Sequence, residues 1–514
     1  MGEEGGGRSC GTTRELQKLK QQAMEYYREN DVPRRLEELL NSTFYLQPAD
    51  VYGHLANCFS KLAKPPTICK VVGRNVLDGL GLPTLQVEIF CTIQNFPKNI
   101  CSVVISTHFE VRENALPEQA EAEEVERSEA VSTAVQWVNK TITEELRGIA
   151  PSSQAEVDQV LRTFFESKVQ EEKERRQLEK GLEDQTISIP SPPPPPPPAR
   201  KKGQRQGRTD TLTEKPILPP EPVEPVLSGS MAIGAVSLAV AKTSAMLDNN
   251  PLYLNIALLK HPQEQPTKLT IPLLMVSLVS CGKSSPGKLN LMKEVICIPH
   301  PGLTAKQGVE MLLEIQKHIN KTIEMPPPPK TETKKGHNGN KRSQDSEQWD
   351  SIYNALGSRC YIIAGTTSKS ISKLLENGNI SIPKSSGLII KHTNQTTMSD
   401  LVQITNLLDS KKHIAVFGST EGESSDDSLV DLAIGLGVRF IKLGGLSRGE
   451  RVTKYNRLFT IEEELVQKGA LGFNEEHTFF SLHEEAEKAT VAGGPPELLE
   501  PIFPTEVMEG LAKA

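Results

Sequence analysis

A lysine near the C-terminal end of the sequence stands where a strand-like run meets a glycine turn. In "RFIKLGGLSRGE", Lys442 ends the apolar run and Gly444 and Gly445 follow it, before a long, charged and amphipathic segment that predicts a helix. An α/β enzyme uses a cation at such a position, at the carboxyl edge of its sheet, to hold an anionic substrate. The alternative is an ordinary lysine on an exposed surface.

The composition limits the class of protein. A chain of 514 residues has room for two or three folded units, and its net charge of −7 does not indicate nucleic-acid binding. Eight cysteines are scattered without a C-x-x-C pair, which argues against a disulfide framework or zinc site and favours a reducing, intracellular compartment. We find no secretory leader and no run of about 18 apolar residues, so we predict a soluble protein.

Two segments of low complexity interrupt the chain. The first, residues 166–228, passes from a charged run into "PSPPPPPPPARKK" and predicts a disordered insert with polyproline II structure. It is either low-complexity padding or a ligand for a proline-binding domain. The second, residues 324–348, contains "EMPPPPKTETKKGHNGNK" and falls inside what otherwise has the pattern of one α/β domain.

Residues 14–64 have the pattern of amphipathic helices, with Asp31 and Pro33 placed for a helix start. The apolar residues form two stripes at helical spacing: Val32, Leu36, Leu39 and Leu40, then Val51, Leu55, Phe59 and Leu62. Helices of this size cannot close a core alone. The pattern resembles docking and dimerisation modules of the regulatory-subunit and Dpy-30 type, which implies a two-chain bundle that binds an amphipathic helix of an anchoring protein. The alternative is a hairpin that caps its own domain.

From Val71 the sequence changes to strands, since "VVGRNVLDGLGLPTLQVEIFCTI" alternates apolar and polar residues around a turn. This stretch, "AVSTAVQWVNKTITEEL" and, most specifically, "SMAIGAVSLAVAKTSAMLDNNPLYLNIA" resemble the N-terminal capping domain of enolases. "LMKEVICIP", "GLIIKHTNQ" and "RFIKLGGLSRGERVTKYNRLFTIEEEL" continue the resemblance in order. It spans about residues 71–475 and is greatest to a divergent, sperm-type branch of the family.

The resemblance implies an α/β fold. An α+β capping domain would take residues 71–165 and 229–265, and a (β/α) barrel would take residues 266–480, followed by a tail, residues 481–514. A complete eight-stranded barrel needs several strand-helix units where this chain has its second low-complexity segment, so on the order of 80 residues are missing. We therefore predict an incomplete barrel with unpaired strand edges.

The chemistry of enolases is the dehydration of 2-phosphoglycerate to phosphoenolpyruvate in glycolysis, with two Mg²⁺ ions stabilising the enolate. By resemblance, Lys391 at the end of "GLIIK" is the proton acceptor. Lys442 binds the substrate carboxylate, and Glu294 in "MKEVICIP" is the active-site glutamate close to the substrate. Each is expected where a barrel strand ends.

Several positions depart from the enolase pattern. Ser106 is the stand-in for a metal-contacting serine of the lid loop, and Ser285 stands where the family has a substrate-contacting histidine. Thr420 replaces the phosphate-binding arginine, in "GSTEGE" with Ser419, and Glu421 beside it would repel phosphate. Because the metal aspartate after "CYII" is also absent, we predict that the Mg²⁺ ligands are largely missing and that no tight pair of Mg²⁺ sites forms.

Three functions of different classes remain open. The first is a lyase, phosphopyruvate hydratase, acting through Lys391, Lys442 and Glu294. The second is a catalytically weak or inactive enolase-like scaffold. The third, compatible with the second, is a homodimer, or a heterodimer with other enolases, anchored through the N-terminal helices. The resemblance implies a cytoplasmic location that includes the sperm flagellum, and we expect neither nucleic acid nor membrane as a partner.

Overall fold

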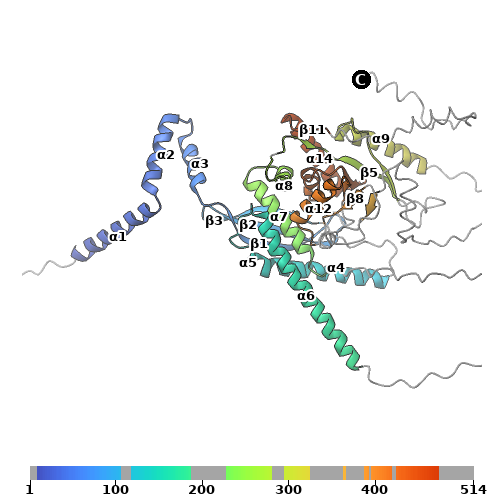
Figure 1. The fold of residues 1–514 in the computed structure, drawn as a ribbon, viewed down its shortest axis with the longest axis horizontal. Helices are drawn as coiled ribbons and strands as arrows, with labels where there is room; N and C mark the ends of the chain where they lie inside the picture. Colours follow the sequence, from blue (N-terminus) through green and yellow to red (C-terminus); the bar gives the residue numbers. More distant parts are fainter. Residues whose placement is uncertain are drawn as a thin grey trace, which may run out of the picture.

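The computed structural model describes nine stretches of the chain: residues 9–105, 117–186, 227–264, 266–280, 294–324, 363–365, 387–392, 395–418 and 424–473. Figure 1 shows three parts in chain order: an arm of helices, a small sheet with helices packed on it, and a larger α/β unit. The predicted α/β class is confirmed, with a small helix-covered sheet followed by strands and helices that form an open barrel within the described residues.

The N-terminal arm consists of helices that point away from the rest of the molecule (Figure 1). They are α1 (Ser9–Glu29), α2 (Val32–Leu46) and α3 (Val51–Leu62). Pro33 stands in the first turn of α2, and the Asp50 carboxylate accepts a hydrogen bond from the N–H of Gly53 (2.9 Å) at the start of α3. Within α2 and α3 the one buried residue is Thr43, so this hairpin has no core of its own.

The small sheet is an antiparallel meander in the order β1-β2-β3, as the alternating pattern predicted. Its strands are β1 (Thr67–Leu77), β2 (Pro83–Ile93) and β3 (Phe96–Val104). The Asp78 carboxylate closes the first turn by accepting hydrogen bonds from the N–H groups of Leu80 (2.8 Å) and Leu82 (2.9 Å). Gln94 and Asn95 close the second turn with φ of 51° and 68°, which matches the twist of a tight hairpin.

Helices cover the sheet and connect it to the larger unit. On one side lie α4 (Pro117–Trp137), a π turn (Val138–Ile142) and α5 (Thr143–Glu145). Helix α7 (Met231–Leu247) is buried along most of its length, because it packs on β2 and β3 as well as on helices of the larger unit. Within the described ranges no single helix is long and apolar enough to cross a membrane, and α7 with α8 (Leu252–Lys260) passes by length and composition only as a pair bent by 108°.

Helix α6 (Gln154–Thr186) corrects the predicted start of the disordered insert at residue 166. The helix continues for some twenty residues beyond that point and projects into solvent (Figure 1). Ion pairs at helical spacing stabilise this part: Glu172 accepts from Arg175 (2.8 Å) and from Arg176 (2.7 Å), and Glu179 accepts from Arg175 (2.9 Å). The charged run was thus a helix signal, and the proline tract lies outside the described residues.

The larger unit contains a sheet of six described strands in the order β6-β5-β10-β9-β8-β7. They are β5 (Leu273–Ser280), β6 (Glu294–Cys297), β7 (Ile363–Gly365), β8 (Gly387–Ile390), β9 (Ile414–Gly418) and β10 (Phe440–Gly444). All neighbours are parallel except β5 and β6. The last strand, β10, pairs with the first, β5, as in a closing barrel. Among the described strands the barrel is therefore open between β6 and β7.

Described helices precede the first of these strands and follow four of the six, as in a (β/α) barrel. Besides α8 they are α9 (Ala305–Glu324), α12 (Met398–Ser410), α13 (Ser428–Gly435) and α14 (Gly449–Gln467). A short parallel pair, β4 (Leu269–Thr270) and β11 (Leu471–Gly472), joins the beginning and end of the unit. The Thr397 side chain begins α12 with a capping box to Asp400, directly after the segment that carries Lys391.

A buried carboxylate, Asp158 on α6, ties the capping domain to the larger unit. It accepts hydrogen bonds from the hydroxyl of Ser237 on α7 (2.6 Å) and from the amide side chain of Gln154 (2.9 Å). Its other oxygen accepts from the N–H (2.9 Å) and the hydroxyl (2.6 Å) of Ser399 in the first turn of α12. The site is favourable for a carboxylate because a helix N-terminus presents free N–H groups and a positive dipole end.

We expect Asp158→Ala to lower the free energy of unfolding by about 3 kcal/mol, because it leaves several buried donors without their acceptor. Ser399→Ala is the matched control: it removes one hydroxyl and leaves the backbone contact, so its cost should be about 1 kcal/mol. Chemical denaturation of both variants measures the difference. Equal, small losses in the two would contradict the role of Asp158.

Candidate active site

The two lysines singled out from the sequence lie at the same edge of the larger sheet. Lys391 directly follows the last residue of β8, and Lys442 lies within β10, two residues before its end. Strand β9 runs between them, where Lys442 pairs with Gly418 and Ile390 pairs with Phe417. Since neighbouring strands are about 4.8 Å apart, the two backbones stand about 10 Å from each other.

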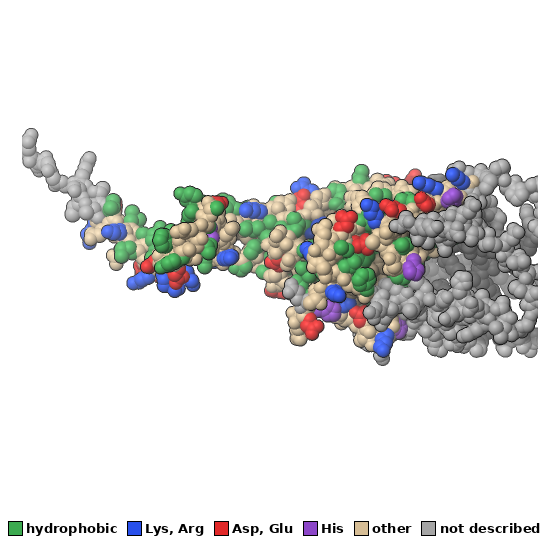
Figure 2. Space-filling view, turned by 90° about the horizontal axis from the view of Figure 1, so that it is seen from above, with side chains coloured by type: hydrophobic (Ala, Val, Ile, Leu, Met, Phe, Trp, Pro, Cys, Tyr) green, Lys and Arg blue, Asp and Glu red, His purple; other side chains and the backbone are tan. Residues whose placement is uncertain are grey.

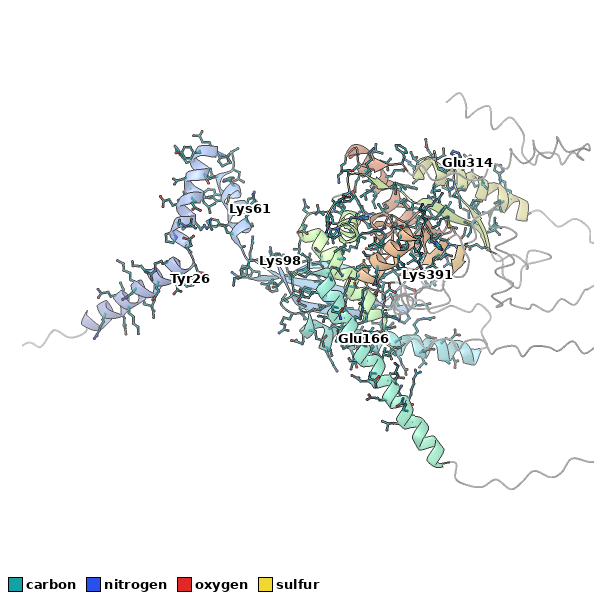
Figure 3. The ribbon with its side chains drawn as sticks, in the orientation of Figure 1. Tyr26, Lys61, Lys98, Glu166, Glu314 and Lys391 are labelled. Atoms are coloured by element: carbon teal, nitrogen blue, oxygen red, sulfur yellow. The ribbon has the colours of Figure 1, made fainter. Side chains whose placement is uncertain are left out.

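Gly418 places no side chain between the two lysines. A Cβ atom at this glycine would lie 3.9 Å from both Cγ and Cε of Lys391, so the Lys391 side chain lies beside this bare backbone. Figure 3 shows Lys391 within the larger unit. Both side chains are half-buried, which leaves their ammonium groups within reach of a ligand.

Glu294 reaches the same edge, though not in the way the sequence predicted. It begins β6 and does not end a strand, because β6 runs antiparallel to β5 and pairs Glu294 with Ser280 at the carboxyl end of β5. Its Oε2 lies 2.5 Å from Nζ of Lys442, and its Oε1 accepts a hydrogen bond from the hydroxyl of Ser277. Glu294 and Lys442 therefore form one site, and Lys391 stands across β9 from it.

A glycine turn and an arginine complete this edge. Gly444 has a φ of +81°, which glycine adopts without strain, and the hydroxyl of Tyr455 donates a hydrogen bond to its carbonyl (3.0 Å). A Cβ at Gly444 would lie 2.9 Å from both Cζ and Nε of Arg451, in the first turn of α14. The turn thus brings a further positive charge to the edge, and a side chain at Gly444 would collide with it.

His392, next to Lys391, is partly buried beside α7. Burial lowers its pKa from 6.5 to about 4, against the opposite effect of the Gly234 and Thr396 backbones and of the Asp426 charge. Its Nε2 is buried without a hydrogen-bond partner among the described residues. The ring is therefore neutral at pH 7 and anchors the segment that follows Lys391.

We expect His392 to make the protein less stable as the pH falls from 6.5 towards 4. A histidine with a lowered folded-state pKa contributes stability that is present above its ordinary pKa and lost below it, because the unfolded chain then binds a proton that the folded chain does not. The loss is at most about 3 kcal/mol. Burial raises the pKa of Asp158 and Asp431, and these carboxyls act in the opposite direction.

The measurement is therefore a difference between wild type and His392→Gln, by denaturant unfolding at pH 7.5 and pH 4.5. The wild type should lose more stability than the variant on acidification. The same loss in both proteins would show that His392 does not titrate in this way.

The described residues do not fit a magnesium site. Within these ranges no group of three or more histidine, cysteine or acidic side chains is placed to hold a metal ion. A hard cation needs several oxygen ligands, and both carboxylate oxygens of Glu294 already contact Ser277 and Lys442. The positions named for their departure from the enolase pattern lie outside the described residues: Ser106, Ser285, Ser419, Thr420 and Glu421.

Three contacts of this site were not predicted from the sequence: those of Ser277, His392 and Arg451. Ser277 lies in an apolar strand, and its hydroxyl is the feature of the sequence that could have indicated a polar contact there. His392 follows Lys391 directly, and Arg451 lies in the predicted helix after the glycine turn. Nothing local in the sequence indicates that their side chains meet this edge.

Fold and site together define a (β/α) barrel protein with a capping domain and two lysines at the carboxyl edge of its sheet. A family model described as "Enolase, C-terminal TIM barrel domain" matches residues 338–478. The chain is 68% identical to Enolase 4 of Homo sapiens over 617 residues, covering 100% of this chain and 99% of that protein. It is 60% identical to Enolase 4 of Mus musculus over 622 residues (100% of each) and 32% identical to that of Danio rerio over 553 residues (90% and 93%).

The chain therefore belongs to the enolase family. The alignment with the human protein spans 617 positions, which is 103 more than the 514 residues of this chain, so at least 103 residues of the human protein have no counterpart here. This agrees with the prediction of a shortened form of an enolase.

Proposed function

We propose that this chain binds 2-phosphoglycerate and phosphoenolpyruvate at the carboxyl edge of its sheet and carries out the phosphopyruvate hydratase reaction at a low rate. The observation that supports it is the placement of Lys391 and Lys442 on either side of the bare strand position at Gly418. Two lysines at one edge of a sheet suit a ligand with more than one negative charge.

In this proposal Lys442 binds the substrate carboxylate and Lys391 takes the proton from the neighbouring carbon. The proton moves from C2 of 2-phosphoglycerate to Nζ of Lys391, and the electron pair remains on the substrate as an enolate. Enolases of the family generally use Mg²⁺ to stabilise that charge, but the described residues provide no set of ligands for it. The reaction should therefore stop short of efficient turnover.

The first half-reaction can be tested separately from the loss of water. In D₂O, wild-type protein should slowly exchange the C2 proton of 2-phosphoglycerate for deuterium, as followed by NMR, and Lys391→Ala should not. Lys442→Ala should weaken phosphoenolpyruvate binding in calorimetry by at least about 10-fold, because it removes a charge-assisted contact. Neither exchange nor binding by a folded wild-type protein would refute the proposal.

We also propose that the N-terminal arm forms a dimer and binds an amphipathic helix. Several large apolar side chains of α2 and α3 are exposed, among them Leu40 (58%), Phe44 (70%) and Phe59 (44%). Figure 2 shows hydrophobic side chains gathered along this arm. A hydrogen bond from Gln94 to Ser60 (2.6 Å) joins the sheet to the arm, and the apolar side chains stay exposed beside it, so the alternative of a hairpin that caps its own domain leaves them uncovered.

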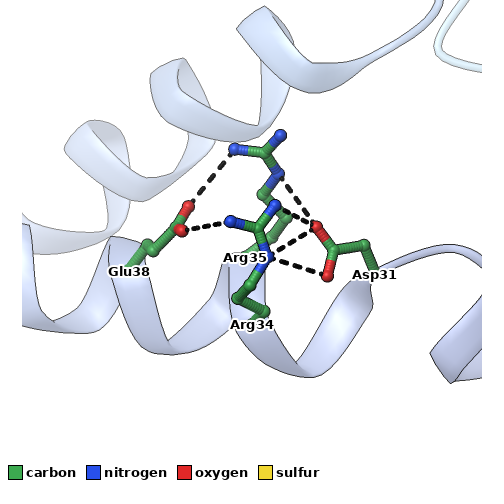
Figure 4. Close-up of polar contacts among 4 residues, drawn as sticks. All are labelled: Asp31, Arg34, Arg35 and Glu38. Carbon is green, nitrogen blue, oxygen red and sulfur yellow. Dashed lines mark hydrogen bonds and ion pairs between the residues drawn. The ribbon is translucent and has the colours of Figure 1, made fainter.

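The charged face of α2 indicates which side a partner covers. Arg34 bridges Asp31 (2.5 Å) and Glu38 (2.9 Å), and Arg35 contacts Glu38 (3.2 Å) (Figure 4). Arg34 lies two residues from Leu36, about 200° away around the helix. The charged side chains of α2 pair with one another in water. The face that carries the leucines is therefore the one that a second chain would bury. Anchoring through it would hold the protein in the cytoplasm, at the sperm flagellum.

A further inference from the structure

In the structure Lys442 already has an acidic partner. Its ammonium lies 2.5 Å from Oε2 of Glu294, and the two side chains are 30% and 22% exposed. Strand β5 runs between β10 and β6, so this pair crosses over the face of a strand at the open end of the sheet. The position that would receive a ligand carboxylate is thus occupied by a carboxylate of the chain itself.

We propose that Glu294 is an internal competitor for Lys442, which a carboxylate ligand must displace, and that Ser277 holds Glu294 at the site once it has been displaced. This inference rests on the proposed binding function and adds a step to it. A ligand carboxylate and Glu294 cannot both approach one ammonium closely without repelling each other. Binding therefore exchanges one ion pair for another, and the affinity measured is the difference between them.

Ser277 makes this exchange possible because it contacts the other oxygen of Glu294. Its hydroxyl donates to Oε1, while Lys442 contacts Oε2, so the two partners do not compete for the same atom. When Lys442 turns to the ligand, the hydroxyl contact remains and holds the carboxylate at the site. Ser277 is thus a positioning residue that acts through Glu294.

The experiment is calorimetric titration of folded variants of this chain with phosphoenolpyruvate at low salt. Glu294→Gln should bind about 3- to 10-fold more tightly than wild type, since it keeps the shape and removes the competing charge. The gain should vanish in the Lys442→Ala background, where there is no ion pair to displace. Ser277→Ala should bind about 3-fold more weakly than wild type, and should have no effect when combined with Glu294→Gln. Glu314→Gln, at an exposed position of α9, controls for the loss of one negative charge.

Each outcome decides something. If wild type binds phosphoenolpyruvate and Glu294→Gln binds it equally tightly or more weakly, this inference is overturned and the proposed function is not. An equal gain in the Lys442→Ala background would also overturn it, because the effect would then be a general one of net charge. If no folded variant binds phosphoenolpyruvate, the proposed function fails and this inference fails with it. Circular dichroism of every variant establishes that the proteins are folded.

Discussion

Purified protein is expected to form phosphoenolpyruvate from 2-phosphoglycerate roughly 10⁴-fold or more slowly than an enolase with a complete barrel. By resemblance to enolases, the missing barrel units would carry the general acid and metal carboxylates of the reaction. Loss of a general acid costs about 10²–10⁴-fold, and loss of preorganised charge at an enolate costs roughly a further 10²–10³-fold per interaction. The retained Lys391 and Lys442 do not offset these losses. Moreover, Glu294 balances the charge of Lys442, which stands across β9 from Lys391.

The measurement is a spectroscopic assay of phosphoenolpyruvate, with and without Mg²⁺, on wild type and Lys391→Ala. An enolase with a complete barrel, assayed in parallel, provides the reference rate. Any residual turnover in wild type should disappear in the alanine variant. A rapid, Mg²⁺-dependent turnover that Lys391→Ala abolishes would show that the residues of this shortened chain suffice, and that the missing barrel units are dispensable.

The second large effect concerns the N-terminal arm. Full-length protein should sediment as a dimer, and Leu36→Glu combined with Leu40→Glu should raise its dissociation constant by roughly 10³-fold or more, because four unpaired charges would be buried in each dimer. Ser42→Glu is the matched control, since it adds the same charge to α2 on an exposed residue away from this leucine face. It should leave the dimer intact.

Sedimentation velocity over a range of protein concentrations distinguishes the outcomes. A wild-type monomer would contradict the dimer and leave the arm as a hairpin without a second chain. A dimer that both variants leave intact would place the interface elsewhere on the molecule. Pulldown with an amphipathic helix of an anchoring protein then tests the second partner, and the double leucine variant should fail to bind it.

The sequence by itself determined the local elements of this protein. The alternation from Val71 predicted the β1–β2 hairpin, and the apolar stripes predicted α2 and α3. The runs before Lys391 and Lys442 predicted the strands that place them at one edge. These predictions succeeded because strand and helix periodicities depend on neighbours within a few residues. The prediction of disorder from residue 166 was wrong for a related reason. The high polarity of this part of α6 was interpreted as disorder, although its charges pair along a helix.

What only the tertiary structure decided is how side chains far apart in sequence meet. Glu294 and Lys442 are separated by 148 positions, and their ion pair requires β6 to run antiparallel beside β5. No local sequence pattern determines that direction, because the pattern of a single strand is the same beside a parallel or an antiparallel neighbour. The same holds for Ser277 and Asp158, whose partners lie on other elements. Residue type and spacing indicated Lys391 and Lys442 as the cations of the site. The packing of distant strands decided that Lys442 already contacts the carboxylate of Glu294.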